Sequence, residues 1–475
     1  MHIAEWGAFF LGETVVMSML IRNGRVVTTG HDGVMDILIE GETVAAMGRD
    51  LPATVDIVLD ASDRLVIPGG IDVHTHLDAP VGGAVSSDDF ETGTRAAAHG
   101  GTTCIVDFAT QTRGERLSGA LDRWLAKGSK ATIDYGIHMI VVDMPEERLG
   151  DIDAMADRGV TSFKLFMAYP GALMTDDGTI LRVMERCREV GALPCVHAEN
   201  GSVIDHLVRR ALARGETAPV YHALTRPPAV EAEATHRAIM LAGLAGAPLY
   251  IVHVTCSGAA EEIRMARSRG LRVAGETCPQ YLFLSIADLR RPGFEGAKYV
   301  LSPPLREAAD QGALWEALAQ NHLQVVSTDH CPFFYGTQKL ADTTDFTRIP
   351  NGGPGIENRM ELLYHFGVHE RRITLSRWID LMSTTPAKLF GLYPKKGTIQ
   401  AGSDADIVLW DPGQCHTISA SRHHMNVDYS LYEGVTVTGG ADTVIARGDI
   451  IVRSGKWTGK AGRGRFVKRS SSGVS

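Results

Sequence analysis

The 475-residue chain is long enough to bury a large core and exceeds the usual size of a single domain. Its 44% apolar and 22% charged residues are typical of globular proteins and exclude a disordered chain. A formal net charge of -9 argues against a nucleic-acid-binding role. A basic stretch near the end is expected to be a solvated arm or one that contacts another subunit; it comprises Lys460, Arg463, Arg465, Lys468 and Arg469.

Seven scattered cysteines without a CxxC pair predict neither a disulfide framework nor a thiolate zinc site, and they favour a reducing cytoplasm. The opening "MHIAEWGAFFLGETVVMSML" lacks a basic segment, and Glu5 and Glu13 interrupt its apolar run. It therefore predicts neither a signal peptide nor a membrane span. We expect the first sixteen to eighteen residues to form a loose extension.

Short alternating runs separated by Gly and Asp turns predict antiparallel strands in "MLIRNGRVVT", "MDILIEGETVAAMG" and "DIVLDASDRLVIPG". The same pattern returns near the end in "ADIVLWDP", "VTVTGG" and "DTVIARGDIIVRSGKW". Neither group alone has enough strands for independent stability. We therefore expect residues 1–66 and 396–475 to build one small β-sandwich domain together, with the basic stretch as its tail.

Residues 67–395 have a different sequence pattern, in which apolar runs alternate with amphipathic stretches long enough to form helices. Eight such runs occur: "GGIDVHTH", "TTCIVDFA", "DYGIHMIVV", "SFKLFMA", "LPCVHAE", "PLYIVHVT", "LRVAGETC" and "LQVVSTDH". Apolar strands that alternate with helices indicate βα units and a parallel sheet. Eight units predict a closed (β/α)8 barrel of the α/β class.

The ends of these runs carry an unusual set of polar residues. In such a barrel the functional site lies where the strands end, so these side chains should meet there. Strand side chains alternate between faces, so His74 and His76 point the same way, whereas His330 should face away from Asp329 as a structural residue. The converging set is His74, His76, Lys164, His197, His253 and Asp329.

A single histidine in this set would be read as a hydrogen-bonded core residue. Four histidines and an aspartate at one level of a barrel instead predict a metal site. Imidazole and carboxylate are zinc-type ligands, and no thiolate accompanies them.

Lys164 lies inside the apolar run "SFKLFMAY", where an unpaired ammonium would be costly. A protonated lysine has only donors and cannot bind a metal. A neutral lysine can instead react with carbon dioxide to give a carbamate, N6-carboxylysine, whose two oxygens could bridge two cations. The histidines would then divide into two pairs, and Asp329 would complete one side. The simpler alternative is an ion pair between Lys164 and an aspartate.

Several motifs resemble one family in order and spacing from about residue 19 to residue 470. They are "GGIDVHTH", "SFKLFMAY", "HAEN", "HVTCSGA", "ETCPQYL", "LSPPLR", "STDHCPF" and "NGGPGIE". Together they resemble the dihydropyrimidinase and D-hydantoinase group of the amidohydrolase superfamily. The HxH motif alone would indicate only the superfamily.

The resemblance implies a binuclear zinc enzyme, commonly tetrameric, that opens 5,6-dihydropyrimidines or 5-substituted hydantoins to N-carbamoyl amino acids. By similarity, one metal is bound by His74, His76, Lys164 and Asp329, and the other by Lys164, His197 and His253. Tyr169 carries over as a substrate and catalytic residue. Ser302 and Asn351 carry over as residues whose backbones hold the ring imide.

The chemistry expected of these residues agrees with that activity. Two cations acidify a water between them and polarise a carbonyl. Asp329 is placed to take a proton and to pass it to the departing ring nitrogen. Tyr169 can donate its hydroxyl hydrogen to a developing oxyanion, although a tyrosine at a strand end is otherwise most often a packing residue.

Three other functions remain open. Dihydroorotases usually follow HxH with Leu and Arg, whereas "HTHLDAP" has Asp78, an acid that should repel an anionic substrate. Allantoinases share the metal ligands and differ mainly in the loops. A scaffold of the collapsin response mediator type keeps the fold but has lost ligands, whereas this chain keeps them all.

The loop after the first barrel run departs from the family pattern. Related hydantoinases often have bulky residues where this chain has Ala79 and Val81. The two positions are expected near the exocyclic substituent of the substrate, so small residues there predict a roomy pocket.

Overall fold

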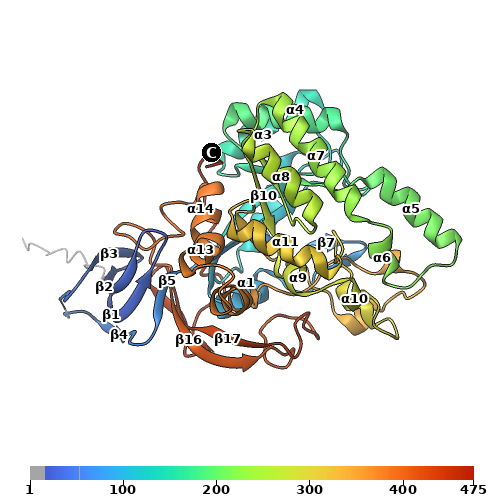
Figure 1. Ribbon diagram of the computed structural model, residues 1–475. Helices are drawn as coiled ribbons and strands as arrows, with labels where there is room; N and C mark the ends of the chain where they lie inside the picture. Colours follow the sequence, from blue (N-terminus) through green and yellow to red (C-terminus); the bar gives the residue numbers. More distant parts are fainter. Residues whose placement is uncertain (1–16, 53, 475) are drawn as a thin grey trace, which may run out of the picture.

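The computed structural model describes residues 17–52 and 54–474, which form two large β-sheets with covering helices (Figure 1). The first sixteen residues, where we expected most of a loose extension, lie outside the described part of the chain. Strand β1 begins at Ser18.

An eight-stranded parallel sheet forms the larger part of the fold. Its strands are β6 (Gly70–Thr75), β9 (Thr102–Thr110), β10 (Asp134–Ile140), β11 (Ser162–Phe166), β12 (Leu193–His197), β13 (Leu249–Ile251), β14 (Val273–Thr277) and β15 (Val325–Val326). They follow one another in chain order around the sheet. The sheet closes where Thr75 bridges to His330 and the His76 amide donates to the His330 carbonyl at 2.9 Å. The predicted (β/α)8 barrel is confirmed.

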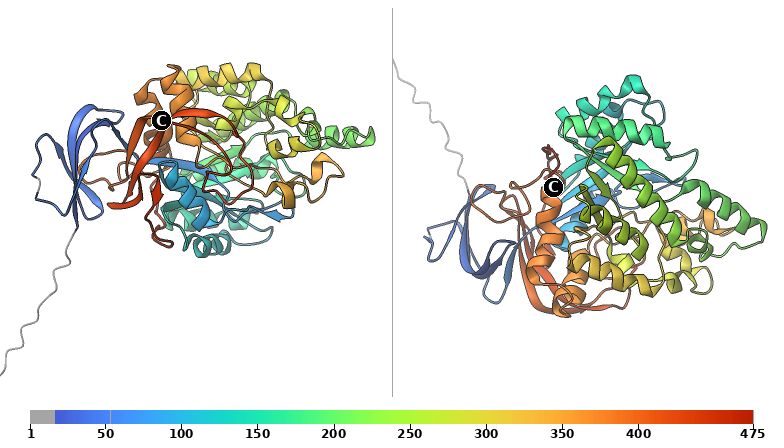
Figure 2. Two further views of the ribbon diagram at one scale, coloured as in Figure 1. Left: turned by 90° about the horizontal axis from the view of Figure 1, so that it is seen from below. Right: turned by 45° about the horizontal axis from the view of Figure 1, so that its top comes forward.

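Helices lie between successive strands and surround the barrel, as the views in Figures 1 and 2 show. Those up to the last strand are α1 (Phe90–His99), α2 (Leu117–Gly128), α3 (Gly150–Asp157), α4 (Asp177–Val190), α5 (Gly201–Ala213), α6 (Tyr221–Leu224), α7 (Pro228–Ala245), α8 (Ser257–Ser268), α9 (Pro279–Phe283), α10 (Ile286–Leu289) and α11 (Ala308–Ala319). Three follow it: α12 (Arg359–Leu363), α13 (Leu375–Ile379) and α14 (Thr385–Leu389).

Short helical turns and one hairpin lie in the connecting loops. They are β7 (Pro80–Val81), β8 (Ala84–Val85), η1 (Glu146–Arg148), η2 (Glu295–Tyr299), η3 (Tyr335–Lys339), η4 (Phe346–Arg348), η5 (Tyr364–His369) and η6 (Asp380–Thr384). The β7–β8 hairpin follows the first barrel strand, and η3 and η4 follow the last one. These loops therefore lie at the end of the barrel where the strands finish.

Local sequence signals explain where the helices begin and end. The Asp89 carboxylate accepts hydrogen bonds from the amides of Glu91 and Thr92 at 2.9 and 3.0 Å, which satisfies free donors in the first turn of α1. Helix α4 ends at Val190 and is followed by the cap residue Gly191, whose φ of 69° lies in the left-handed region that favours glycine. Such signals fix the βα connections that bring the strand ends together.

Nine strands from the two ends of the chain form a second sheet. They are β1 (Ser18–Val27), β2 (Asp32–Glu40), β3 (Thr43–Gly48), β4 (Ile57–Asp60), β5 (Leu65–Pro68), β16 (Ile407–Thr417), β17 (Thr436–Ala446), β18 (Asp449–Arg453) and β19 (Lys456–Trp457). The terminal groups join where β5 pairs with β16, so blue and red strands meet in Figure 1. The predicted association of the two ends is confirmed, but the sheet is mixed: β1 runs parallel to β4 and β5.

A buried charge cluster links the sheet to the barrel. The Lys396 ammonium lies 2.9 Å from Asp134, 2.9 Å from Asp404 and 2.7 Å from Asp406. Burial would lower the pKa of Lys396, but these carboxylates raise it well above its usual value. The ammonium is therefore charged where β10 begins, next to the connection into β16.

The basic C-terminal stretch is anchored on its own chain, so the expectation of a solvated arm was wrong for its buried part, Arg469. Arg465 pairs with Glu42 through two contacts of 2.7 and 2.8 Å, and its carbonyl accepts from the Tyr135 amide at 3.0 Å. Arg469 is 4% exposed and donates to Ser162 at 2.8 Å. The stretch thus packs against its own chain, while the side chains of Lys460, Arg465 and Lys468 remain exposed as expected for an arm.

No helix in the described ranges has the length and apolar character needed to cross a membrane. All seven cysteines are free, six of them buried and only Cys415 exposed.

Candidate active site

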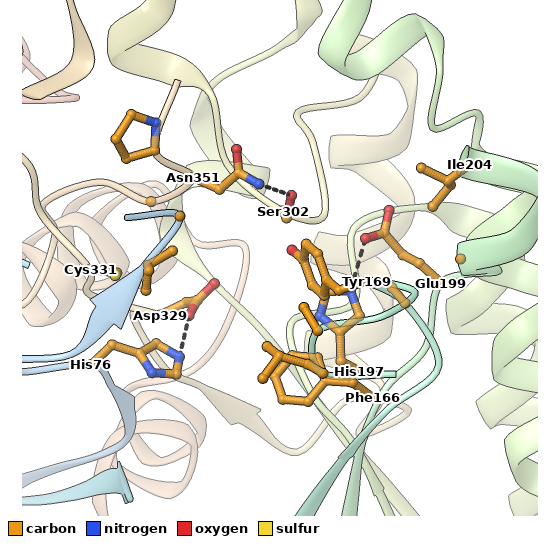
Figure 3. Close-up of a pocket in the computed structure, with 18 of the residues that line it drawn as sticks. His76, Phe166, Tyr169, His197, Glu199, Ile204, Ser302, Asp329, Cys331 and Asn351 are labelled. Atoms are coloured by element: carbon orange, nitrogen blue, oxygen red, sulfur yellow. Dashed lines mark hydrogen bonds and ion pairs between the residues drawn. The ribbon is translucent and has the colours of Figure 1, made fainter. Parts of the chain in front are cut away.

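A cavity of about 630 Å³ opens where the barrel strands end, and it gathers all nine side chains predicted from the sequence. They are His74, His76, Lys164, Tyr169, His197, His253, Ser302, Asp329 and Asn351. The strand ends position them because parallel strands of a barrel finish at one rim. Figure 3 shows His76 and Asp329 on one side of the cavity and Tyr169, His197 and Glu199 on the other.

A neutral His74 has no hydrogen on Nε2 to donate to the Asp329 carboxylate that faces it. The Nδ1 atom of His74 contacts the Glu276 carboxylate, so a neutral His74 carries its hydrogen there. Its Nε2 lone pair then lies 3.3 Å from Asp329 Oδ1, and His76 Nε2 lies 3.2 Å from the same oxygen. A cluster of acceptors of this kind is what a cation would stabilise.

A second group of acceptors lies beside the first. Glu199 accepts from His197 Nε2 at 2.9 Å, which leaves Nδ1 of His197 only 2.9 Å from Nε2 of His253. The Nδ1 atom of His253 is buried without a hydrogen-bond partner in the described residues. Ligand atoms of His74, His253 and Asp329 lie within 4.8 Å of one another, so the donors can surround a metal ion.

Lys164 lies between these groups. Its side chain is 1% exposed, and its Nζ lies 3.5 Å from His74 Nε2 and over the rings of Phe108 and Phe166. Among the described residues no carboxylate oxygen lies within 4.0 Å of this amine, so the alternative of an ion pair with an aspartate is wrong. Burial lowers the pKa of Lys164 to about 8, which makes the neutral amine accessible near neutral pH.

Burial also keeps two of these histidines, His74 and His253, uncharged. It lowers the pKa of His74 and of His253 well below the usual value, and the nearby Lys164 acts in the same direction. For Asp329 burial alone would raise the pKa, but His74, His76 and Lys164 together hold it below its usual value. Neutral imidazoles and an ionised carboxylate are the protonation states that ligate metals.

Sequence reasoning missed the two carboxylates that orient these histidines. Glu276 is fully buried and accepts from the Tyr250 hydroxyl at 2.9 Å and from the His253 amide at 3.2 Å. Burial raises its pKa to about 7. Glu199 lies two residues after His197 in "HAEN", a spacing that could have indicated a shared face. Such outer carboxylates fix the tautomer and the ring orientation of metal-binding histidines.

Three site residues have a strained backbone. Tyr169, His253 and Asp329 have φ values of 65°, 39° and 53°, in the left-handed region that residues with a side chain rarely adopt. Each such residue costs about 1–3 kcal/mol and persists only where the surrounding structure holds it. The barrel therefore fixes these side chains at the cavity at some expense of stability.

Ser302 and Asn351 form one wall of the cavity, where Figure 3 shows them in contact. The Asn351 amide donates to Ser302 Oγ at 3.2 Å. In the described part of the chain, no protein group bonds to the backbone N–H or C=O of either residue. These backbone groups thus remain available to a ligand with both donors and acceptors.

Tyr169 faces the same cavity from the loop after β11. Burial of its hydroxyl raises the pKa of Tyr169 to about 12, so the phenol keeps its proton at neutral pH. It is therefore a hydrogen-bond donor rather than a base.

Other expectations have mixed outcomes. His330 is fully buried, bonds to Asp88 at 3.0 Å and does not line the cavity, as expected. Ala79 and Val81 do line it. Asp78 does not: its carboxylate lies 3.4 Å from Lys127, so it cannot screen substrates by charge as we expected.

Comparisons with known proteins agree with this site. The model of the amidohydrolase family matches residues 65–451. A D-hydantoinase of Streptomyces coelicolor is 55% identical over 95% of this chain and 98% of its own, and one of Geobacillus stearothermophilus is 50% identical over 96% and 98%. The crystal structure of a dihydropyrimidinase from Brevibacillus agri superposes with a TM-score of 0.95 at 53% identity, over 96% of this chain and 99% of that one.

Both the sequence identity and the superposition extend over nearly the whole chain. The chain belongs to the amidohydrolase family, within its dihydropyrimidinase and D-hydantoinase group.

Proposed function

We propose that this protein hydrolyses the cyclic amide of 5-substituted hydantoins or 5,6-dihydropyrimidines to N-carbamoyl amino acids. The observation that carries the proposal is the convergence of four histidines, Lys164 and Asp329 in one cavity. The names of its D-hydantoinase and dihydropyrimidinase relatives support the same ring chemistry.

Two zinc ions bridged by N6-carboxylysine at Lys164 fit the donors of this cavity. One would be held by His74, His76, Lys164 and Asp329, and the other by Lys164, His197 and His253. Opposed acceptor atoms, the unpartnered Nδ1 of His253 and the lowered pKa of Lys164 support this assignment. Nitrogen and oxygen donors without a thiolate favour zinc. When bound, the two ions supply an acidified water and polarise a carbonyl.

The protein's own groups have distinct roles in the ring opening. Asp329, ionised and at the cavity surface, takes a proton from the attacking water and passes it to the departing ring nitrogen. Tyr169 donates its hydroxyl hydrogen to the oxygen that gains negative charge. The free backbone groups of Ser302 and Asn351 pair with the N–H and C=O of the ring imide, which orients the ring for attack.

The assembly and the location follow the same family pattern. We propose a homotetramer in the cytoplasm, and the seven free cysteines support a reducing compartment. Light scattering after size-exclusion chromatography measures the subunit number directly, and a mass other than four subunits would contradict the tetramer.

A substrate panel tests the function and separates it from its rivals. Zinc-loaded protein should open dihydrouracil, hydantoin or either enantiomer of phenylhydantoin and should release N-carbamoyl amino acids, measured by chromatography. Exclusive hydrolysis of allantoin or dihydroorotate would replace the proposed substrate class. A protein that binds no stoichiometric zinc and opens no ring would be a scaffold.

A further inference from the structure

Lys339 is buried like Lys164 and Lys396, but it lies outside both the metal-binding cluster and the charge cluster of Lys396. It is the last residue of η3 and is 0% exposed. Its Nζ donates to the carbonyls of Val300 at 3.1 Å and Pro350 at 3.0 Å. No carboxylate oxygen of the described residues lies within 4.0 Å of it, and it lies 6.0 Å from the centre of the Phe333 ring.

The two carbonyls belong to residues 300–302 and 350–352, the two segments that carry Ser302 and Asn351 to one wall of the cavity. Val300 precedes Ser302 by two positions, and Pro350 immediately precedes Asn351. The segments also touch directly, because the Gly352 amide donates to the Val300 carbonyl at 3.0 Å. In the described ranges, Lys339 is the one side chain from outside the two segments that bonds to both.

This position is an expensive place for an amine. Burial lowers the pKa of Lys339 to about 7, and neither an acid nor solvent compensates for the loss of hydration. An aliphatic side chain of similar volume would fill the space at lower cost but could not donate to two carbonyls. A lysine at this position therefore supplies two hydrogen bonds that an aliphatic residue of the same size could not make.

We propose that Lys339 is a positioning residue that fixes the spacing between the backbone groups of Ser302 and Asn351, and so sets the affinity for the ring imide. The inference rests on the proposed ring-opening function. Lys339 touches neither the metal-binding residues nor the cavity, so its effect should fall on substrate binding.

Lys339→Met and Lys339→Gln separate the effect of the hydrogen-bond donors from the effect of side-chain volume. Methionine keeps most of the volume and removes both hydrogen bonds, whereas glutamine is shorter but retains two N–H donors. Lys298→Met is the matched control, because Lys298 lies in the neighbouring η2, where its ammonium contacts Glu295 at 3.4 Å and the Tyr335 ring at 4.6 Å. In the described residues its side chain donates no hydrogen bond to either cavity segment.

We expect Lys339→Met to raise KM by about tenfold or more, with kcat and the zinc content within about twofold of wild type. Lys339→Gln should recover part of the affinity, and Lys298→Met should match wild type. Amide hydrogen exchange should accelerate in residues 300–302 and 350–352 of Lys339→Met and stay unchanged in β11.

Unchanged KM and exchange in Lys339→Met would overturn the inference, as would equal losses in the two Lys339 variants. If neither variant yields folded, zinc-loaded protein, Lys339 is a folding residue and the inference is also wrong. A wild-type protein that opens no cyclic amide would instead contradict the proposed function, whereas the exchange measurement needs no substrate and tests the link between the two segments alone.

Discussion

The Nζ atom of Lys164 lies 3.5 Å from Nε2 of His74, and no carboxylate of the described residues is close enough to neutralise it. The pair of nitrogens is buried among apolar rings, and Asp329 Oδ1 lies 3.3 Å from the same Nε2 atom of His74. A bare ammonium is costly in such a place, and the carbamate proposed for Lys164 would remove that cost by binding metal.

Lys164→Ala should therefore lose both metals and activity, because no remaining group can bridge two cations. Added short-chain carboxylic acids should restore some of each by supplying a bridging carboxylate. Zinc analysis together with the hydrolysis rate measures both. Full zinc and activity in Lys164→Arg would refute the carbamate, because guanidinium neither forms one nor binds a metal.

Tyr169→Phe keeps the aromatic ring and removes only the donor. If the hydroxyl stabilises the oxyanion, kcat should fall by roughly 10² to 10³, the usual effect of deleting one such donor. Steady-state kinetics at equal zinc content measure the effect. An unchanged kcat would show that Tyr169 only packs against its neighbours.

Ala79 and Val81 are small and line the cavity, so the cavity should admit large 5-substituents. Ala79→Met should lower kcat/KM for phenylhydantoin and spare dihydrouracil, by roughly 10- to 200-fold between the two substrates. Ala84→Met, in the same hairpin but outside the cavity lining, is the control.

Equal losses on both substrates in Ala79→Met would indicate a folding or loop effect and remove Ala79 from the substituent pocket. A wild-type enzyme that opens dihydrouracil far better than any bulky hydantoin would refute the roomy pocket itself.

His99 provides a pH-dependent contribution to stability. Burial, helped by the stacked His424 ring at 3.4 Å, lowers the pKa of His99 from 6.5 to about 3. The stability associated with the neutral ring is therefore complete above pH 6.5 and is lost as the pH falls toward 3. The phenylalanine ring of His99→Phe cannot be protonated. The melting temperature of this variant should therefore fall less than that of wild type between pH 7 and pH 5.

Thermal unfolding at the two pH values measures this difference. The exposed His206, changed to Phe, serves as the control and should behave as wild type. An identical pH dependence in wild type and His99→Phe would show that other groups carry the acid sensitivity.

The metal-binding cluster could be predicted from the sequence because, in a parallel barrel, residues at the ends of successive strands become neighbours in space. His74, His197 and Asp329 all occur at or just after strand ends, so knowing that the strands are parallel was enough to place them together. The strand alternation likewise predicted that His330 points away from the cavity.

Features set by loops and long-range contacts could not be predicted in this way. Asp78 turns away from the cavity with a φ of 52° and pairs with Lys127, 49 positions later. Lys339 is joined to Val300 across 39 positions, with no periodic pattern to indicate it. The basic tail looked solvated because charge alone does not reveal that Arg469 enters the base of the barrel.

The central claim, a two-metal site that opens cyclic amides, is tested most directly by titrating metal-free protein with zinc in the presence of bicarbonate and following the opening of 5-phenylhydantoin. The rate should rise with bound zinc and reach its plateau at two ions per subunit, with N-carbamoyl phenylglycine as the product. Full activity of the metal-free protein, or no ring opening of this hydantoin at any zinc content, would contradict the account.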